Sequence, residues 1–126
     1  VGFVCSMSSR YTTTASVPIK FQRVTRNDGK GYSNQTGIFT APVGGLYHFY
    51  WSLLTYASKP VAIDLKHNGN LVGRAYFQGL PKYESTSNNL YLRLNKDDKV
   101  YLQASGDGGV IHENLYTIFG GELIRY

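Results

Sequence analysis

The sequence predicts an all-β fold of the sandwich class. Nowhere along its 126 residues do apolar side chains recur at helical spacing. Short runs of alternating apolar and polar residues recur instead, separated by clusters of Gly, Asn, Asp, Ser and Pro. These runs number about ten, and strands of this kind pack as two facing sheets. We therefore expect residues 1–126 to form one domain with its own core.

Residues 36–56 are predicted to contain the central strand. Pro42, Gly44 and Gly45 interrupt this segment, because proline donates no ladder hydrogen bond and glycine permits a sharp turn. The strand that follows is bulky on both faces, with Tyr47, Phe49, Trp51 and Leu53 on one and His48, Tyr50, Ser52 and Leu54 on the other. One face would line the core, and the other would pack against something else.

The remaining strands follow in chain order at residues 3–7, 17–24, 61–66, 71–77, 88–94, 99–104 and 115–124. Turn-forming residues dominate the segments between them, including 27–31, 34–37, 78–86, 95–98 and 105–109. Asn68-Gly69 is the strongest hairpin signal. The single Cys5 excludes an intrachain disulfide, and its alternation with Phe3 and Met7 predicts a buried, inert thiol.

Eight residues at fixed spacing resemble the signature of the C1q domain, the globular head of complement C1q, adiponectin and cerebellin. They are Phe21, Asn27, Tyr32, Phe39, Gly45, Tyr47, Phe49 and Trp51, the family placing Phe or Tyr at the last position. Flanking motifs at residues 17–21, 98–102 and 119–123 extend the resemblance over nearly the whole chain.

The resemblance implies a ten-stranded jelly-roll β-sandwich shared with tumour necrosis factor. The first, central and last strands would share one sheet, and both termini would emerge at one end. The expected core residues are Phe21, Phe39, Tyr47, Phe49, Trp51, Phe119 and Leu123. The family consists of secreted binding modules, so we expect an extracellular protein and no enzyme.

The net charge is +5, from 13 basic residues that are scattered rather than clustered. This balance fits either a mildly basic surface or attraction to anionic glycans, lipopolysaccharide or acidic protein faces. No nucleic-acid-binding motif occurs, and no run is long enough to span a membrane. The sequence also lacks the signatures of hydrolases, zinc sites and phosphate-binding loops.

No cofactor or metal is expected. Some C1q-like heads hold calcium through acidic residues before the strand at 88–94, but here residues 75–78 carry aromatics and only Glu84 could match. Calcium takes six to eight oxygen ligands. Of the histidines, His48 is expected to be packed or hydrogen-bonded, and His67 to be solvated.

Residues 74–84 are the predicted ligand site, because they combine cations with tyrosines at an end of the sandwich. The residues are Arg74, Tyr76, Lys82 and Tyr83. The alternative is a solvated loop with core-anchoring tyrosines. Asn34-Gln35-Thr36 fits an N-glycosylation acceptor in an exposed turn, although such tripeptides also occur by chance.

Doubled apolar faces on three strands predict a homotrimer, which the resemblance also implies. Tyr50, Tyr91, Tyr116 and Ile118 would form an exposed apolar patch at the subunit interface. Three functions stay open at this point. The first is a pattern-recognition protein or lectin that binds glycans or microbial surface molecules in innate immunity. The second is a cerebellin-like or hormone-like ligand of a protein receptor. The third is a structural head that nucleates trimers of a longer, stalked chain.

Overall fold

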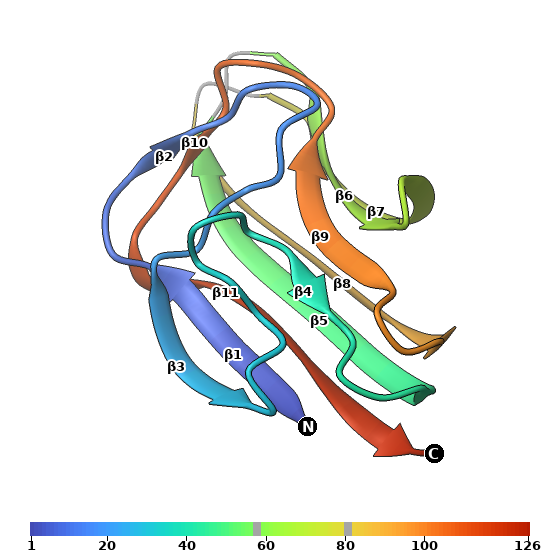
Figure 1. Ribbon diagram of the computed structural model, residues 1–126. Coiled ribbons are helices and arrows are strands. Elements are labelled where there is room, and N and C mark those ends of the chain that lie inside the picture. Colours follow the sequence, from blue (N-terminus) through green and yellow to red (C-terminus); the bar gives the residue numbers. More distant parts are fainter. Residues whose placement is uncertain (57–58, 80–81) are drawn as a thin grey trace.

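The computed structural model describes residues 1–56, 59–79 and 82–126, and these ranges contain strands and turns but no helix. They hold eleven strands: β1 (Gly2–Met7), β2 (Tyr11–Thr12), β3 (Arg23–Asp28), β4 (Phe39–Thr40), β5 (Gly45–Tyr56), β6 (Val61–His67), β7 (Asn70–Phe77), β8 (Tyr83–Leu94), β9 (Lys99–Ala104), β10 (Val110–Ile111) and β11 (Asn114–Arg125). Figure 1 shows them as two facing layers. The predicted all-β sandwich is confirmed.

Two antiparallel sheets make up the layers. The seven-stranded sheet has the order β2-β10-β5-β11-β1-β3, with β8 along the free edge of β5, and the four-stranded sheet has the order β4-β9-β6-β7. The first, central and last long strands therefore share one sheet, as expected. Both termini lie at one end of the sandwich (Figure 1), where the Leu123 amide donates to the Val1 carbonyl at 2.8 Å.

The predicted strand at residues 17–24 is wrong. Pairing with β1 begins only at Arg23 and continues to Asp28, so part of the expected turn at 27–31 is strand. Upstream, Pro18 forms an isolated bridge and Ile19 donates to Leu102, while Ile19 and Phe21 insert into the core. Proline cannot donate to a ladder, and its fixed φ holds this segment as an inserted connection instead of a full strand.

The strand predicted at 88–94 begins earlier, at Tyr83, and pairs with the whole of β5. Its first half carries mostly Ser, Thr, Asn and Glu, which gives no apolar alternation to find in the sequence. Edge pairing needs only backbone groups, so these polar residues form strand because β5 offers twelve positions to pair with. The short strands β2 and β10 lie in segments where no strand was predicted.

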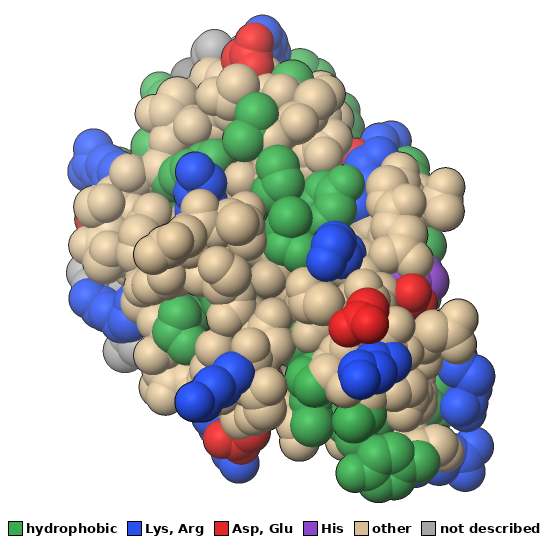
Figure 2. All heavy atoms as spheres, in the orientation of Figure 1, with side chains coloured by type: hydrophobic (Ala, Val, Ile, Leu, Met, Phe, Trp, Pro, Cys, Tyr) green, Lys and Arg blue, Asp and Glu red, His purple; other side chains and the backbone are tan. Residues whose placement is uncertain are grey.

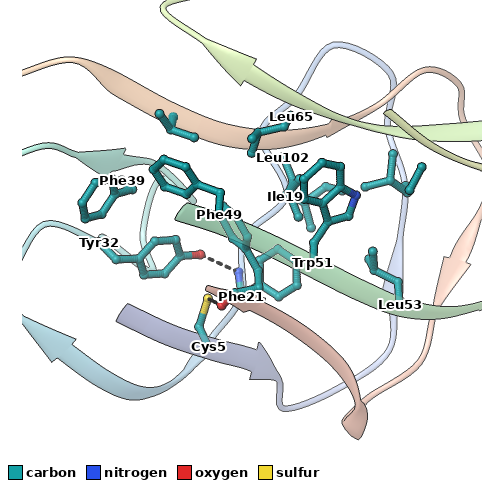
Figure 3. Packing of buried hydrophobic residues seen from close by; sticks show 14 of the residues in the cluster. Cys5, Ile19, Phe21, Tyr32, Phe39, Phe49, Trp51, Leu53, Leu65 and Leu102 are labelled. Carbon is teal, nitrogen blue, oxygen red and sulfur yellow. Dashed lines mark hydrogen bonds between the residues drawn. The ribbon is translucent and has the colours of Figure 1, made fainter. Parts of the chain in front are cut away.

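Aromatic side chains fill the space between the sheets (Figure 3). The Phe3 ring packs against several others. Its centroid lies 5.1 Å from the ring centroid of Tyr32, 4.8 Å from that of Phe39 and 5.0 Å from that of Phe119. Of the expected core residues, six are buried, and one, Leu123, is partly buried and packs against the cluster; the six are Phe21, Phe39, Tyr47, Phe49, Trp51 and Phe119.

Cys5 is also buried in this core, as predicted. Its Sγ lies 3.3 Å from the Phe119 carbonyl, to which the thiol donates. Burial raises the pKa of Cys5 to about 12, so the side chain stays a protonated thiol at physiological pH. A thiol in that state is a poor nucleophile.

Candidate functional site

The outer face of the seven-stranded sheet carries the residues predicted for the subunit interface. Tyr91 is 62% exposed and Tyr116 is 67% exposed, whereas Tyr50 and Ile118 are half-buried. Strand register places Tyr50 opposite Gly120 and Ile118 opposite Ser52. All four side chains thus lie on one face, spread over the adjacent strands β8, β5 and β11.

Polar side chains separate these four residues. A hollow of about 410 Å³ lies beside Tyr50, and its lining is His48, Tyr50, Trp51, Ser52, Ser87, Asn88 and Asn89. The His48 ring packs at a tilt against Tyr91 with ring centroids 4.6 Å apart, and its Nε2 lies 3.1 Å from Asn89 Oδ1. The face therefore combines tyrosines and Ile118 with polar side chains of β5 and β8.

Gly120 shapes this face by having no side chain. A Cβ atom there would collide with the ring of Tyr50, so only glycine lets that ring lie flat across β11. Partial burial raises the pKa of Tyr50, with the nearby Glu122 carboxylate adding to the effect. The pairing of Tyr50 with Gly120 depends on strand register, which the sequence alone does not give.

The four residues predicted to bind ligand do not converge. Arg74 Nε lies 2.6 Å from Asp64 Oδ1 and Nη2 lies 2.9 Å from Oδ2, a bidentate pair in which Asp64 is buried. This pairing raises the pKa of Arg74. Tyr76 is exposed beside it on the outer face of the four-stranded sheet. The Nε–Nη2 edge of the Arg74 guanidinium therefore already binds a carboxylate.

Tyr83 and Lys82 lie at the start of β8, on the other layer. The Tyr83 ring packs edge-on against Tyr56 at 5.7 Å and against His112 at 4.8 Å. A hollow of about 240 Å³ lies there, lined by these three residues with Arg10 and Val110. Leu80 and Pro81, inside the predicted segment, lie outside the described residues.

Glu84, the residue considered for calcium, is engaged by the backbone. The amides of Gln78 and Gly79 donate to its carboxylate at 3.1 and 3.0 Å. Within residues 1–56, 59–79 and 82–126, no three His, Cys, Asp or Glu side chains gather in a group that could hold a metal ion.

His67 is hydrogen-bonded, so the expectation that it is solvated is wrong. Its Nε2 lies 2.9 Å from Asp98 Oδ2, and Asn68 Nδ2 donates to Asp98 Oδ1 at 3.1 Å. The Asn95 amide also donates to Asp98. These bonds lower the pKa of Asp98 to about 2, the one from His67 contributing most. The network ties the β6–β7 hairpin to the turn before β9.

Comparison with known proteins identifies the family. The model of the C1q domain matches residues 2–124. The chain belongs to the C1q domain family. Complement C1q tumor necrosis factor-related protein 2 of Homo sapiens is 31% identical over 95% of this chain. Protein 3 of that series from Mus musculus is 31% identical over 98%, and protein 5 from Rattus norvegicus 33% identical over 92%.

The C1q domain described here spans about half the length of these relatives, at 47%, 51% and 49%. Solved structures share its fold. The globular domain of zebrafish complement 1qA has a TM-score of 0.83 at 20% identity, covering 98% of this chain and 97% of that one. Murine APRIL has a TM-score of 0.80 at 14% identity, covering 98% of each chain. The likeness to APRIL shows the jelly roll common to C1q and tumour necrosis factor.

Proposed function

We propose that this C1q domain is an extracellular binding module, not an enzyme, that works as a homotrimer. The observation that carries the proposal is the outer face of the seven-stranded sheet. It leaves Tyr91 and Tyr116 well exposed beside Tyr50 and Ile118. Aromatic groups gathered on one face of a soluble domain favour association. In the described residues, no helix is long and apolar enough to cross a membrane.

A threefold arrangement suits this face. Each subunit would pack part of its edge against the neighbour's face, and a heterologous contact of this kind closes into a ring when the rotation is right. His48 and Asn89 already satisfy one another, so their burial leaves fewer polar groups without partners. The C1q relatives and the jelly roll shared with tumour necrosis factor support the same assembly.

For the ligand, we propose anionic glycans or microbial surface molecules, as in innate-immune pattern recognition. The net charge of +5 supports this class. On the face drawn in Figure 2, the Lys and Arg side chains are dispersed. Polar surface and small, isolated hydrophobic groups lie between them. Each site would be weak, and three copies on one platform would gain avidity on a repetitive surface.

A protein receptor is the second candidate. It is favoured by the relatives, which are C1q tumor necrosis factor-related proteins, and by the exposed tyrosines, a residue type enriched in protein interfaces.

Asn34, the possible glycosylation site, is exposed, and its Nδ2 donates to the Gln22 carbonyl at 3.2 Å. A glycan there would point into solvent.

Two measurements test the proposal separately. Light scattering at micromolar concentration should give three times the monomer mass of 14.1 kDa, and a monomer would contradict the assembly. A glycan array probed with the trimer should show binding to acidic glycans. An array without any binding would contradict the glycan ligand and favour the protein receptor.

A further inference from the structure

A cleft lies at the end of the sandwich where the termini emerge. It has a volume of about 510 Å³. One wall comes from the connection between β3 and β4, including Lys30 and Thr36, and the other from the turn after β8, including Lys96 and Asp97. Lys99, at the start of β9, closes one side. None of the residues proposed for the trimer face lines it.

The charges in this cleft are unbalanced. Three lysines line it, and Asp97 is the one carboxylate among its lining residues. Lys99 Nζ lies 3.4 Å from Thr40 Oγ1, and no ion pair involves any of the three lysines within the described ranges. Like charges around one hollow repel each other, and a bound anion relieves that repulsion.

Hydrogen bonds hold the two walls in place. The Ala41 amide donates to the Asp98 carbonyl at 2.9 Å and the Asp97 amide donates to the Ala41 carbonyl at 2.8 Å, which ties the turn after β8 to the residue that follows β4. Lys30 and Asp97 both have left-handed backbone, with φ of 58° and 73°. Residues in that conformation persist where the surroundings hold them. A cleft with fixed walls loses little entropy on binding.

The neutral part of the lining suits a sugar. Ser33, Thr36 and Thr40 supply hydroxyl groups, which can donate to and accept from sugar hydroxyls. Ile38 and Pro42 add apolar surface for the face of a sugar ring. Ammonium groups beside hydroxyls and a small apolar surface match a sugar that carries an acidic group.

We propose that this cleft binds an acidic sugar, with its sulfate or carboxylate held between Lys30, Lys96 and Lys99. The inference rests on the proposed anionic-glycan ligand and moves its site from residues 74–84 to the opposite end of the sandwich. Arg74 is paired with Asp64, whereas the three lysines have no carboxylate pair among the described residues.

The test is titration of the full chain with a size-defined heparin tetrasaccharide, followed by calorimetry and backbone amide NMR. Lys30→Gln, Lys96→Gln and Lys99→Gln together should weaken binding roughly tenfold or more, because each exposed ion pair contributes a modest share. Amide shifts should map to residues 29–33 and 96–99. Replacing the same three residues by Arg should keep the affinity, because the charge is retained.

The matched control also removes three positive charges, but at the end of the sandwich opposite the cleft, by Arg10→Gln, Lys59→Gln and Lys82→Gln. Its affinity should fall by less than about threefold, since only long-range attraction is lost. Equal weakening in both triple variants, or amide shifts confined to residues 74–84, would overturn the cleft. Binding to acidic glycans on the array without any binding of the tetrasaccharide would overturn the proposed cleft site and leave the glycan ligand standing. Failure of both assays would overturn the glycan ligand as well.

Discussion

At the residue scale, the family signature has physical reasons that the structure makes visible. Asn27 Nδ2 donates to the Tyr32 carbonyl at 2.9 Å, and the Tyr32 amide donates to Asn27 Oδ1 at 3.0 Å. The Tyr32 hydroxyl accepts from the Phe21 amide at 3.0 Å (Figure 3). Three signature residues thus satisfy one another's polar groups beside the core. Spacing alone revealed the signature but not these bonds, which join residues across a turn.

Asn27→Ala should therefore destabilise the domain. It removes two hydrogen bonds and leaves the backbone of buried Tyr32 without partners, at a cost of about 1–3 kcal/mol. The free energy of unfolding from urea denaturation measures the loss. Asn34→Ala is the control, because that exposed side chain makes one bond to Gln22 and its removal should stay within about 0.5 kcal/mol. Equal stability of the two variants would contradict the role given to Asn27.

At the element scale, long apolar strands were predictable and polar or inserted ones were not. β5, β6 and the second half of β8 alternate apolar residues with a period of two, which the sequence displays directly. β3 and the first half of β8 are mostly polar, and their pairing depends on a neighbour's free edge. The four residues of the predicted ligand site do not come together for a related reason. Arg74 looked available because its partner Asp64 lies directly opposite it across the β6–β7 hairpin, and this pairing depends on strand register.

The turn that joins β8 to β9 should be sensitive to acid through Asp98. Its pKa falls from the ordinary 3.8 to about 2 in the folded protein. A lowered folded pKa stabilises the protein above pH 4, and that contribution is lost as the pH falls from about 4 to 2. Melting temperatures of the wild type should therefore drop over this interval. Asp98→Asn should melt lower at pH 6 and drop less between pH 4 and 2.

Asp97→Asn is the matched control for Asp98, because it changes the neighbouring carboxylate in the same turn and asparagine tolerates its left-handed backbone. Its melting temperature should follow the wild-type pH dependence. If Asp98→Asn loses stability with acid as steeply as the wild type does, the His67–Asp98 network is not the source of the acid sensitivity.

At the scale of the whole molecule, the outer faces of the two sheets differ in the side chains they expose. The four-stranded sheet presents a face where Arg74 and Asp64 neutralise each other, and the seven-stranded sheet presents Tyr91 and Tyr116. The cleft lined by Lys30, Lys96 and Lys99 lies at one end of the sandwich, away from the residues of the proposed trimer face. Assembly and ligand binding can therefore use separate surfaces, so that three clefts would remain available in one trimer.

Introducing charge on the proposed trimer face should give monomers. Tyr91→Asp with Ile118→Asp places two carboxylates per subunit where the neighbour would exclude water, and an unpaired buried charge costs several kcal/mol. The side chains of Tyr91 and Ile118 point away from the core, so each subunit should still fold. Sedimentation velocity should show monomers for this variant at concentrations where the wild type is trimeric.

Tyr76→Asp is the control for this variant, because Tyr76 is 58% exposed, close to the 62% of Tyr91, but lies on the outer face of the four-stranded sheet. It should remain a trimer. The melting temperature gives a second readout. Because assembly stabilises the folded subunits, the melting temperature of a wild-type trimer rises with protein concentration, and that of the monomeric variant does not. A trimer that survives Tyr91→Asp with Ile118→Asp, or that is lost with Tyr76→Asp, would move the subunit interface to the other sheet.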